Sequence, residues 1–263
     1  MEEISPPLPV QRHEPLADAA TLAALQALAV RHRAANGLGM QVLSVVGGSA
    51  ENLLERLPDR VKDGLETATR AALERAFDAG LASRRTVRDH DDRVNSMVTA
   101  AMGAAGGFGG LPTALAELPV TVTVLLRAIQ GIAAEHGFDP SHPQVRADCV
   151  RVFASAGPLE ADDAAEVGFL AARVTITGQS LQALIARVAP RLAAVLGQKL
   201  AAQAAPVLGA VAGAGVNYVF TRYYQEMARV QFGLARLAED TGTEREELAS
   251  ALRGLLAAHG KNR

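Results

Sequence analysis

The sequence predicts an all-α fold, a single compact domain of many helices, and three observations support that prediction. Apolar residues recur three and four positions apart through most of the 263-residue chain, which is the period of an amphipathic helix. The one segment that alternates like a strand, 120–124 (VTVTV), runs directly into a helical pattern. The hydrophobic fraction of 49% comes mainly from Ala, Leu and Val, with no Trp and three Tyr, so Ala- and Gly-rich helices can pack closely.

The first fifteen residues, MEEISPPLPVQRHEP, are expected to form a mobile leader before a helical domain that spans 16–263. They contain acidic residues and four prolines where a secretory signal would have basic residues and then an apolar run. Cys149 is the single cysteine, which excludes an intrachain disulfide. These features favour a cytoplasmic location.

Two helices are expected in the first third of the chain. The first covers 16–35 and ends at the Asn36–Gly37 pair, which is typical of a helix stop. The second covers 58–79, with a proline suited to the first helical position, and ends before Gly80. The mixed-charge stretch 84–93 (RRTVRDHDDR) is typical of a solvated connector.

Two further helices are expected in the middle of the chain, around a turn. The first covers 118–136 and stops at Gly137, and the second opens with Pro143 and runs to Phe153. The glycine cluster that precedes them, GGFGGLP at 106–112, indicates a sharp bend or a close approach of helices.

The last part of the chain predicts more helices, punctuated by proline. A helical region covers 160–188, and Pro190 and Pro206 delimit the next segment. A long helix over 206–238 would extend about 50 Å. The pair Thr243 and Glu246 forms a capping box that opens a terminal helix, which Gly260 ends.

Three stretches carry a resemblance to a known family: GGFGGLP (106–112), ELPVTVTVLLRAIQGIAAEHGFDP (117–140) and GAGVNYVFTRYYQEMARVQFGLARLAED (213–240). With them the chain, after about residue 16, resembles the EcsC family of bacterial proteins. The resemblance implies a helical protein with no established catalytic residues. It also implies a link to an ABC transporter, because the gene that names the family lies beside one.

A polar site is predicted around Arg127, which shares a face of the apolar helix 118–136 with Gln130. A buried guanidinium needs a carboxylate partner, and the candidates are Glu117, Glu135, Asp148 and Glu226. A structural ion pair is the favoured interpretation, and the alternative is a ligand site in which Arg127 or Arg222 holds a phosphate or carboxylate. The candidate cluster for a ligand or an ion pair is Arg127, Gln130, Glu135, Asp148, Arg222 and Glu226.

No catalytic or metal-binding pattern accompanies that cluster. The six histidines include no His-Glu-x-x-His pair, and turn chemistry explains the local group His136, Asp139 and His142. The GGFGG run lacks the spacing and the Lys-Ser/Thr ending of a phosphate-binding loop. A net charge of -2 gives no general reason to bind nucleic acid. We therefore predict no catalytic residue, metal ligand or cofactor, and no nucleic-acid partner.

Two uncharged runs, 98–116 and 200–221, are long enough to cross a bilayer, although both are rich in Ala and Gly and interrupted by Pro. The second contains a GxxxG spacing, which allows close helix packing in membranes and in soluble bundles. All three tyrosines cluster at its end, as interfacial anchors do, although the same helix fits a soluble bundle. The candidate membrane or helix-packing contacts are Gly209, Gly213, Asn217, Tyr218, Tyr223 and Tyr224.

Two classes of function follow from these observations. The first is a non-enzymatic cytoplasmic accessory protein that associates peripherally with the inner membrane face or a membrane protein, with the transporter link that the resemblance implies. The alternative is a soluble helical protein that binds a lipid-like or other small ligand in an apolar pocket. An enzyme would need residues from distant parts of the chain, because no local motif points to one.

Overall fold

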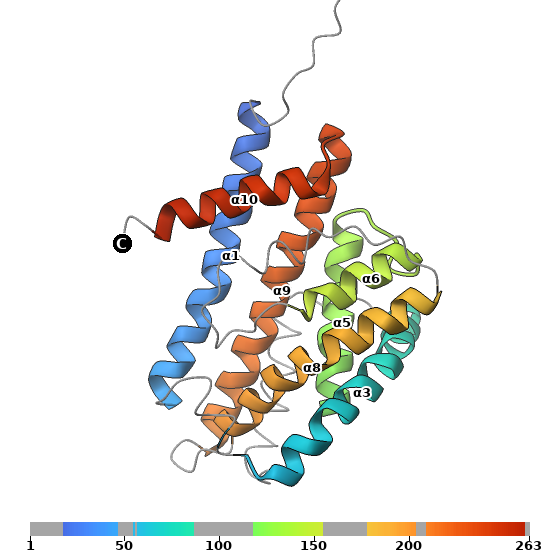
Figure 1. Ribbon diagram of the computed structural model, residues 1–263, viewed down its shortest axis with the longest axis vertical. Helices are drawn as coiled ribbons and strands as arrows, with labels where there is room; N and C mark the ends of the chain where they lie inside the picture. The colour runs from blue at the N-terminus through green and yellow to red at the C-terminus, as the bar shows by residue number, and fades with distance from the viewer. Residues whose placement is uncertain are drawn as a thin grey trace, which may run out of the picture.

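The computed structural model describes residues 18–46, 55, 57–86, 118–154, 178–203 and 209–260. Within those ranges every regular element is a helix, which confirms the predicted fold class. The helices are α1 (Ala19–Val46), α3 (Asp59–Thr86), α5 (Leu118–Glu135), α6 (Pro143–Val152), α8 (Gly178–Gln203), α9 (Gly209–Thr241) and α10 (Arg245–Gly260). Figure 1 shows them packed side by side in one all-α domain.

The 33-residue helix α9 lies at the centre of the domain, between α1 and α5. α1 runs antiparallel to it along one side (Figure 1). On α9, a Cβ added to Gly233 would lie 2.7 Å from Cδ2 of Leu28 on α1, which is closer than real Cβ contacts. The missing side chain at Gly233 therefore lets the two helices approach closely.

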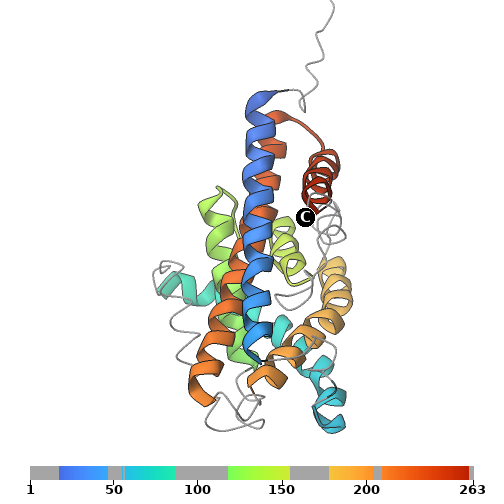
Figure 2. The same ribbon diagram turned by 90° about the vertical axis from the view of Figure 1, so that its left-hand side faces the viewer.

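The helices form two layers around the core. α1, α9 and α5 make one layer, and α10, α6 and α8 lie on one side of it (Figure 2). α3 packs against both α5 and α8 and closes the edge of the domain. The interface between the layers contains fully buried aromatic rings, among them Phe153 just after α6 and Tyr224 of α9, whose centroids are 5.2 Å apart.

Three residues predicted to end a helix do not end one. α1 continues through the Asn36–Gly37 pair to Val46, and α3 continues through Gly80 to Thr86, into the segment predicted as a connector. Pro190 lies inside α8. A glycine in a helix interior costs only about 1 kcal/mol. A proline costs about 3 kcal/mol, and at Pro190 the burial of Val188, Ala189 and Leu192 offsets that cost. The leader 1–15, the cluster 106–112 and most of the predicted region 160–188 lie outside the described residues.

The turns around α6 and α10 test the remaining boundaries. The predicted ends of α5 and α6 are confirmed to within one residue, and Gly137 has a φ of 85°, which favours glycine. α10 begins at Arg245, two residues after the predicted cap. The Thr243 hydroxyl accepts a hydrogen bond from the Thr241 hydroxyl at 2.9 Å. The predicted capping box therefore locates the helix but not its first residue.

Candidate functional site

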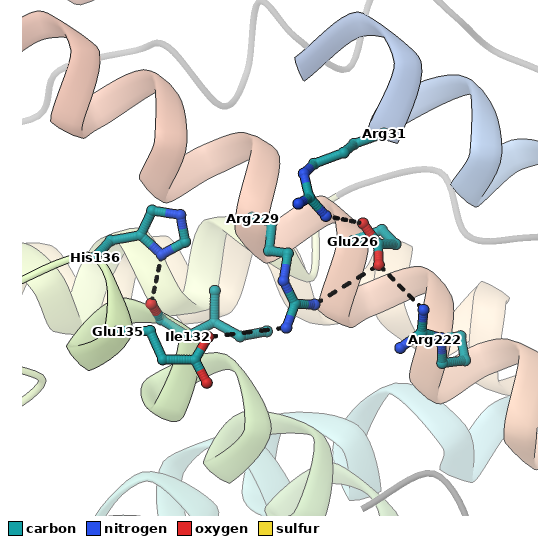
Figure 3. Close-up of polar contacts among 7 residues, drawn as sticks. All are labelled: Arg31, Ile132, Glu135, His136, Arg222, Glu226 and Arg229. Carbon is teal, nitrogen blue, oxygen red and sulfur yellow. Dashed lines mark hydrogen bonds and ion pairs between the residues drawn. The ribbon is translucent and has the colours of Figure 1, made fainter. Parts of the chain in front are cut away.

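Three arginines surround the carboxylate of Glu226, near the middle of α9 (Figure 3). Nη1 of Arg31, from α1, lies 3.0 Å from Oε2 of Glu226. Nη2 of Arg222 lies 3.3 Å from Oε1, and Nη1 of Arg229 lies 3.7 Å from the same oxygen. Arg222 and Arg229 reach Glu226 because residues three and four apart share a helix face. One carboxylate therefore joins α1 to α9 and gathers three guanidinium groups.

The same group extends to α5 through Arg229. Its Nη2 lies 3.8 Å from Oε2 of Glu135, the last residue of α5 (Figure 3). The ion pairs therefore connect all three helices of one layer. We call this set the arginine cluster; it consists of Arg31, Glu135, Arg222, Glu226 and Arg229.

The ion pairs of the arginine cluster join three guanidinium groups and two carboxylates of unequal exposure. The side chain of Glu226 is 11% exposed, whereas those of Arg31 and Glu135 are 48% and 61% exposed. An inner carboxylate is therefore bordered by a guanidinium that reaches solvent. A guanidinium carries five N–H donors, so a solvent-facing arginine in such a group is suited to bind an anion.

A second arginine group, around Asp148 of α6, is buried. Asp148 accepts hydrogen bonds from Arg151 on the same helix and from Nη1 of Arg245 on α10, the latter at 3.1 and 3.2 Å. The Arg151 side chain is 1% exposed and that of Asp148 is 4% exposed. Burial lowers the pKa of the Arg151 guanidinium from its ordinary value, and the charge of Asp148 opposes that shift. We call this set the Asp148 group, and it ties α10 to α6.

Three of the six predicted site residues meet in the arginine cluster. Arg222 and Glu226 form a direct ion pair, and Glu135 joins them through Arg229. The sequence predicts Glu135 and Glu226 as possible partners of Arg127, and the ion pairs of the structure join these two carboxylates to Arg31, Arg222 and Arg229.

The other three predicted residues lie elsewhere. Asp148 belongs to the Asp148 group on α6, between α6 and α10. Gln130 is fully buried on α5, and Arg127 is half-buried on the same helix. The structure therefore divides the predicted cluster into two separate arginine groups and a pair of positions on α5.

The predicted cluster left out Arg31, Arg151, Arg229 and Arg245. Arg229 follows Glu226 by three residues, and Arg151 follows Asp148 by three residues, so helical spacing was a usable signal for both. Arg31 is 195 positions from Glu226, and Arg245 is 97 positions from Asp148. No local pattern marks pairs that are so far apart in the sequence.

Three of the six predicted membrane or helix-packing contacts lie inside the fold. Asn217, Tyr223 and Tyr224 are buried. The ring of Tyr224 packs edge-on against Tyr223, with centroids 5.3 Å apart. These three side chains are therefore part of the core. Tyr218 differs, because 40% of it is exposed.

Among the described residues, α5 is the one helix long and apolar enough to cross a membrane, and 56% of it is buried inside the fold. A core helix of a soluble protein passes the same test, so this is weak support for a span. The predicted run 98–116 lies outside the described residues. The run 200–221 divides between the end of α8 and the first turns of α9, which contain Gly209 and Gly213.

The turn between α5 and α6 uses its polar side chains locally. Asp139 accepts hydrogen bonds from the backbone N–H and the hydroxyl of Ser141, at 2.8 and 2.7 Å, and these bonds lower the pKa of its carboxyl. Nδ1 of His142 accepts a hydrogen bond from the backbone N–H of Gln144 and caps α6. The part of the chain that the structure describes contains no group of three or more His, Cys, Asp and Glu placed to hold a metal.

The exposed face of α1 is almost uncharged. We call it the outer face of α1; within 21–37 it consists of Leu22, Ala23, Gln26, Ala27, Val30, Arg31, Ala34 and Gly37. Arg31 is the single charged residue of this set, and Val30 is 58% exposed. A helix that faces water ordinarily carries charged and polar residues on that side. The outer face of α1 therefore lacks the composition of a solvated surface.

The exposed face of α3 shows the ordinary composition. Within its described positions from 59 to 76, the exposed residues are Asp59, Lys62, Asp63, Gly64, Glu66, Thr67, Ala68, Arg70, Glu74 and Arg75. Seven of these ten are charged, against one of eight on α1. The two helices therefore present very different surfaces.

The fold and these sites define an all-helical protein whose described polar sites are arginine–carboxylate groups. The chain belongs to the EcsC protein family, because the model of that family matches residues 50–237, well over half of the sequence. The match begins at residue 50 and not near residue 16, so it contains Arg222, Glu226 and Arg229 but leaves out α1 and α10. Comparison with curated proteins and with solved structures gives no match.

Proposed function

We propose that this EcsC family member is a non-enzymatic accessory protein that associates peripherally with an anionic membrane surface, with α1 lying against the lipid. The outer face of α1 carries this proposal, because it exposes Leu22 and Val30 and has Arg31 as its single charge. Helices that lie in the membrane interface combine an apolar face with basic residues at its border.

The charges beside the outer face of α1 suit an anionic surface. Arg31 gives the outer face of α1 a positive charge that reaches solvent, and it also belongs to the arginine cluster. A basic residue near an anionic leaflet contributes about 1 kcal/mol. Burial of one exposed valine contributes about the same again. Because the two contributions are similar, high salt is expected to weaken the association without abolishing it.

The proposed location is the cytoplasmic side of the inner membrane, whose inner leaflet carries the anionic lipids that this surface suits. The proposed link to an ABC transporter system rests on the family resemblance alone. In that role the protein would lie on the cytoplasmic surface of the membrane that contains the transporter.

Fractionation of cells that express the full chain tests the membrane association. Wild type is expected in the membrane fraction, with partial release by high salt. Ala27→Glu adds a negative charge to the outer face of α1, and Ala68→Glu adds the same charge to the exposed face of α3. For Ala27→Glu the ratio of membrane-bound to soluble protein should fall by about tenfold. For Ala68→Glu this ratio should equal that of wild type. Equal distributions of the two variants would contradict the proposed function.

A second candidate function, the binding of a lipid-like or other small ligand between helices, is favoured by Gln231 of α9. This side chain is fully buried, and neither of its amide atoms has a hydrogen-bond partner among the described residues. An unmet buried amide costs about 1–3 kcal/mol, which a bound ligand or water would offset.

Native mass spectrometry of protein purified without detergent tests this second candidate. A retained ligand that Gln231→Leu loses would support it. A ligand-free wild type, together with a Gln231→Leu variant of equal or greater thermal stability, would contradict it.

A further inference from the structure

Arg31 belongs both to the outer face of α1 and to the arginine cluster. Its guanidinium pairs with Glu226, while about half of its side chain reaches solvent. The preceding residue, Val30, is the most exposed large hydrophobic side chain among the described residues. Long basic side chains reach from an apolar surface to the level of the lipid headgroups. If Val30 is buried in a bilayer, Arg31 therefore lies at the level of the lipid phosphates.

We propose that Arg31 and Arg222 bind the phosphate of an anionic lipid headgroup, and that Glu226 is an internal carboxylate that holds these arginines when the protein is off the membrane. This inference rests on the proposed membrane association. It names Arg31 and Arg222 as the residues that bind the headgroup, and Glu226 as the carboxylate that competes with the lipid phosphate for them.

The geometry suits an exchange of one anion for another. Oε2 of Glu226 pairs with Arg31, and Oε1 pairs with Arg222 and Arg229. A guanidinium recognises a carboxylate and a phosphate with the same planar pair of donors. In the folded protein the carboxylate oxygens of Glu226 therefore contact the same guanidinium donors that the phosphate oxygens of a lipid would contact.

Charge and exposure favour the same exchange. A phosphodiester would bring a negative charge to Arg31, about half of whose side chain already reaches solvent. An ion pair with a half-exposed partner contributes little net stability, so Arg31 can leave Glu226 at small cost. The Asp148 group cannot exchange its carboxylate for a lipid phosphate in this way, because Asp148 and Arg151 are both buried.

Flotation of the full-length protein with vesicles tests the inference, with phosphatidylcholine alone compared to a mixture of phosphatidylcholine and phosphatidylglycerol. Two variants change the arginine cluster, Arg31→Gln and Glu226→Gln. Two matched controls, Arg70→Gln and Glu66→Gln, remove the same charges from an exposed pair on α3, in which Nη2 of Arg70 lies 3.2 Å from Oε1 of Glu66. Arg31→Gln should bind mixed vesicles about fivefold more weakly, and Glu226→Gln about fivefold more strongly. Each control should stay within about twofold of wild type.

The outcomes separate the inference from the function on which it rests. If wild type ignores both kinds of vesicle, membrane association itself is wrong. If wild type binds mixed vesicles but Arg31→Gln matches Arg70→Gln, the association stands and the headgroup site is wrong. Circular dichroism checks the folding of Glu226→Gln. If that variant is unfolded, the headgroup site is tested by the comparison of Arg31→Gln with Arg70→Gln.

Inorganic phosphate at constant ionic strength distinguishes a lipid phosphate from a free one. The expected result is that it leaves vesicle binding unchanged. If it displaces wild type from the vesicles and raises the thermal stability of wild type but not of Arg31→Gln, the site takes free phosphate and the headgroup assignment is overturned.

Discussion

The Asp148 group and the arginine cluster both hold a carboxylate among arginines, but in different surroundings. Asp148 and Arg151 are shielded from water between α6 and α10, so neither can leave the other without a large desolvation cost. In the arginine cluster, Arg31 and Glu135 reach solvent and can be hydrated when a partner leaves. The first group therefore organises the fold, whereas the second can exchange its partners.

The largest expected effect of a substitution is that of Asp148→Asn, which leaves Arg151 buried without its negative partner. We expect the free energy of unfolding to fall by about 3 kcal/mol, measured by urea denaturation. The control Asp63→Asn removes an exposed carboxylate of α3 and should change stability by less than about 0.5 kcal/mol. If both variants were equally stable, the Asp148 group would not organise the fold.

Glu226→Gln is expected to have a smaller effect on stability. The free energy of unfolding should fall by about 1 kcal/mol, because the arginines around Glu226 include a half-exposed one that water can solvate. Urea denaturation beside Glu66→Gln, the exposed control on α3, measures the difference. A loss as large as that of Asp148→Asn would make Glu226 a structural anchor and would argue against partner exchange.

Asp139 extends the comparison to a fully exposed carboxylate and has the smallest expected effect. Because hydrogen bonds from Ser141 lower its pKa in the folded state, its charged form stabilises the fold above the ordinary carboxyl pKa. That contribution is lost as the pH falls through the lowered pKa. Asp139→Asn should therefore melt below wild type at neutral pH, and the gap should narrow below about pH 4. A gap that thermal melts show to be independent of pH would contradict this assignment.

The fold could be predicted from the sequence where strong local signals coincide. The helices α5 and α6 are bounded by Gly137, which takes a positive φ, and by Pro143 at the first helical position, and both boundaries are confirmed. The stops at Gly37 and Gly80 are wrong because a glycine costs a helix only about 1 kcal/mol. The stop at Pro190 is wrong because buried neighbours such as Val188 and Leu192 offset the larger cost of a proline. The local sequence does not show whether tertiary packing will offset the cost of a glycine or proline within a helix.

The arginine cluster could be predicted only in part. The pair of Arg222 and Glu226 follows from helical spacing, which is a local signal. The contribution of Arg31 depends on the register between α1 and α9, which is set by contacts such as that of Leu28 at Gly233. The burial of Tyr223 and Tyr224 depends on the same tertiary arrangement, so composition could not separate an interfacial anchor from a core residue.

Membrane association through the outer face of α1 is tested most directly by flotation of the purified full chain with vesicles of phosphatidylcholine and phosphatidylglycerol, beside Ala27→Glu and Ala68→Glu. The account predicts that wild type and Ala68→Glu float with the mixed vesicles while Ala27→Glu stays behind with the free protein. If wild type stays behind as well, or if both variants float equally, the outer face of α1 is not a membrane-binding surface.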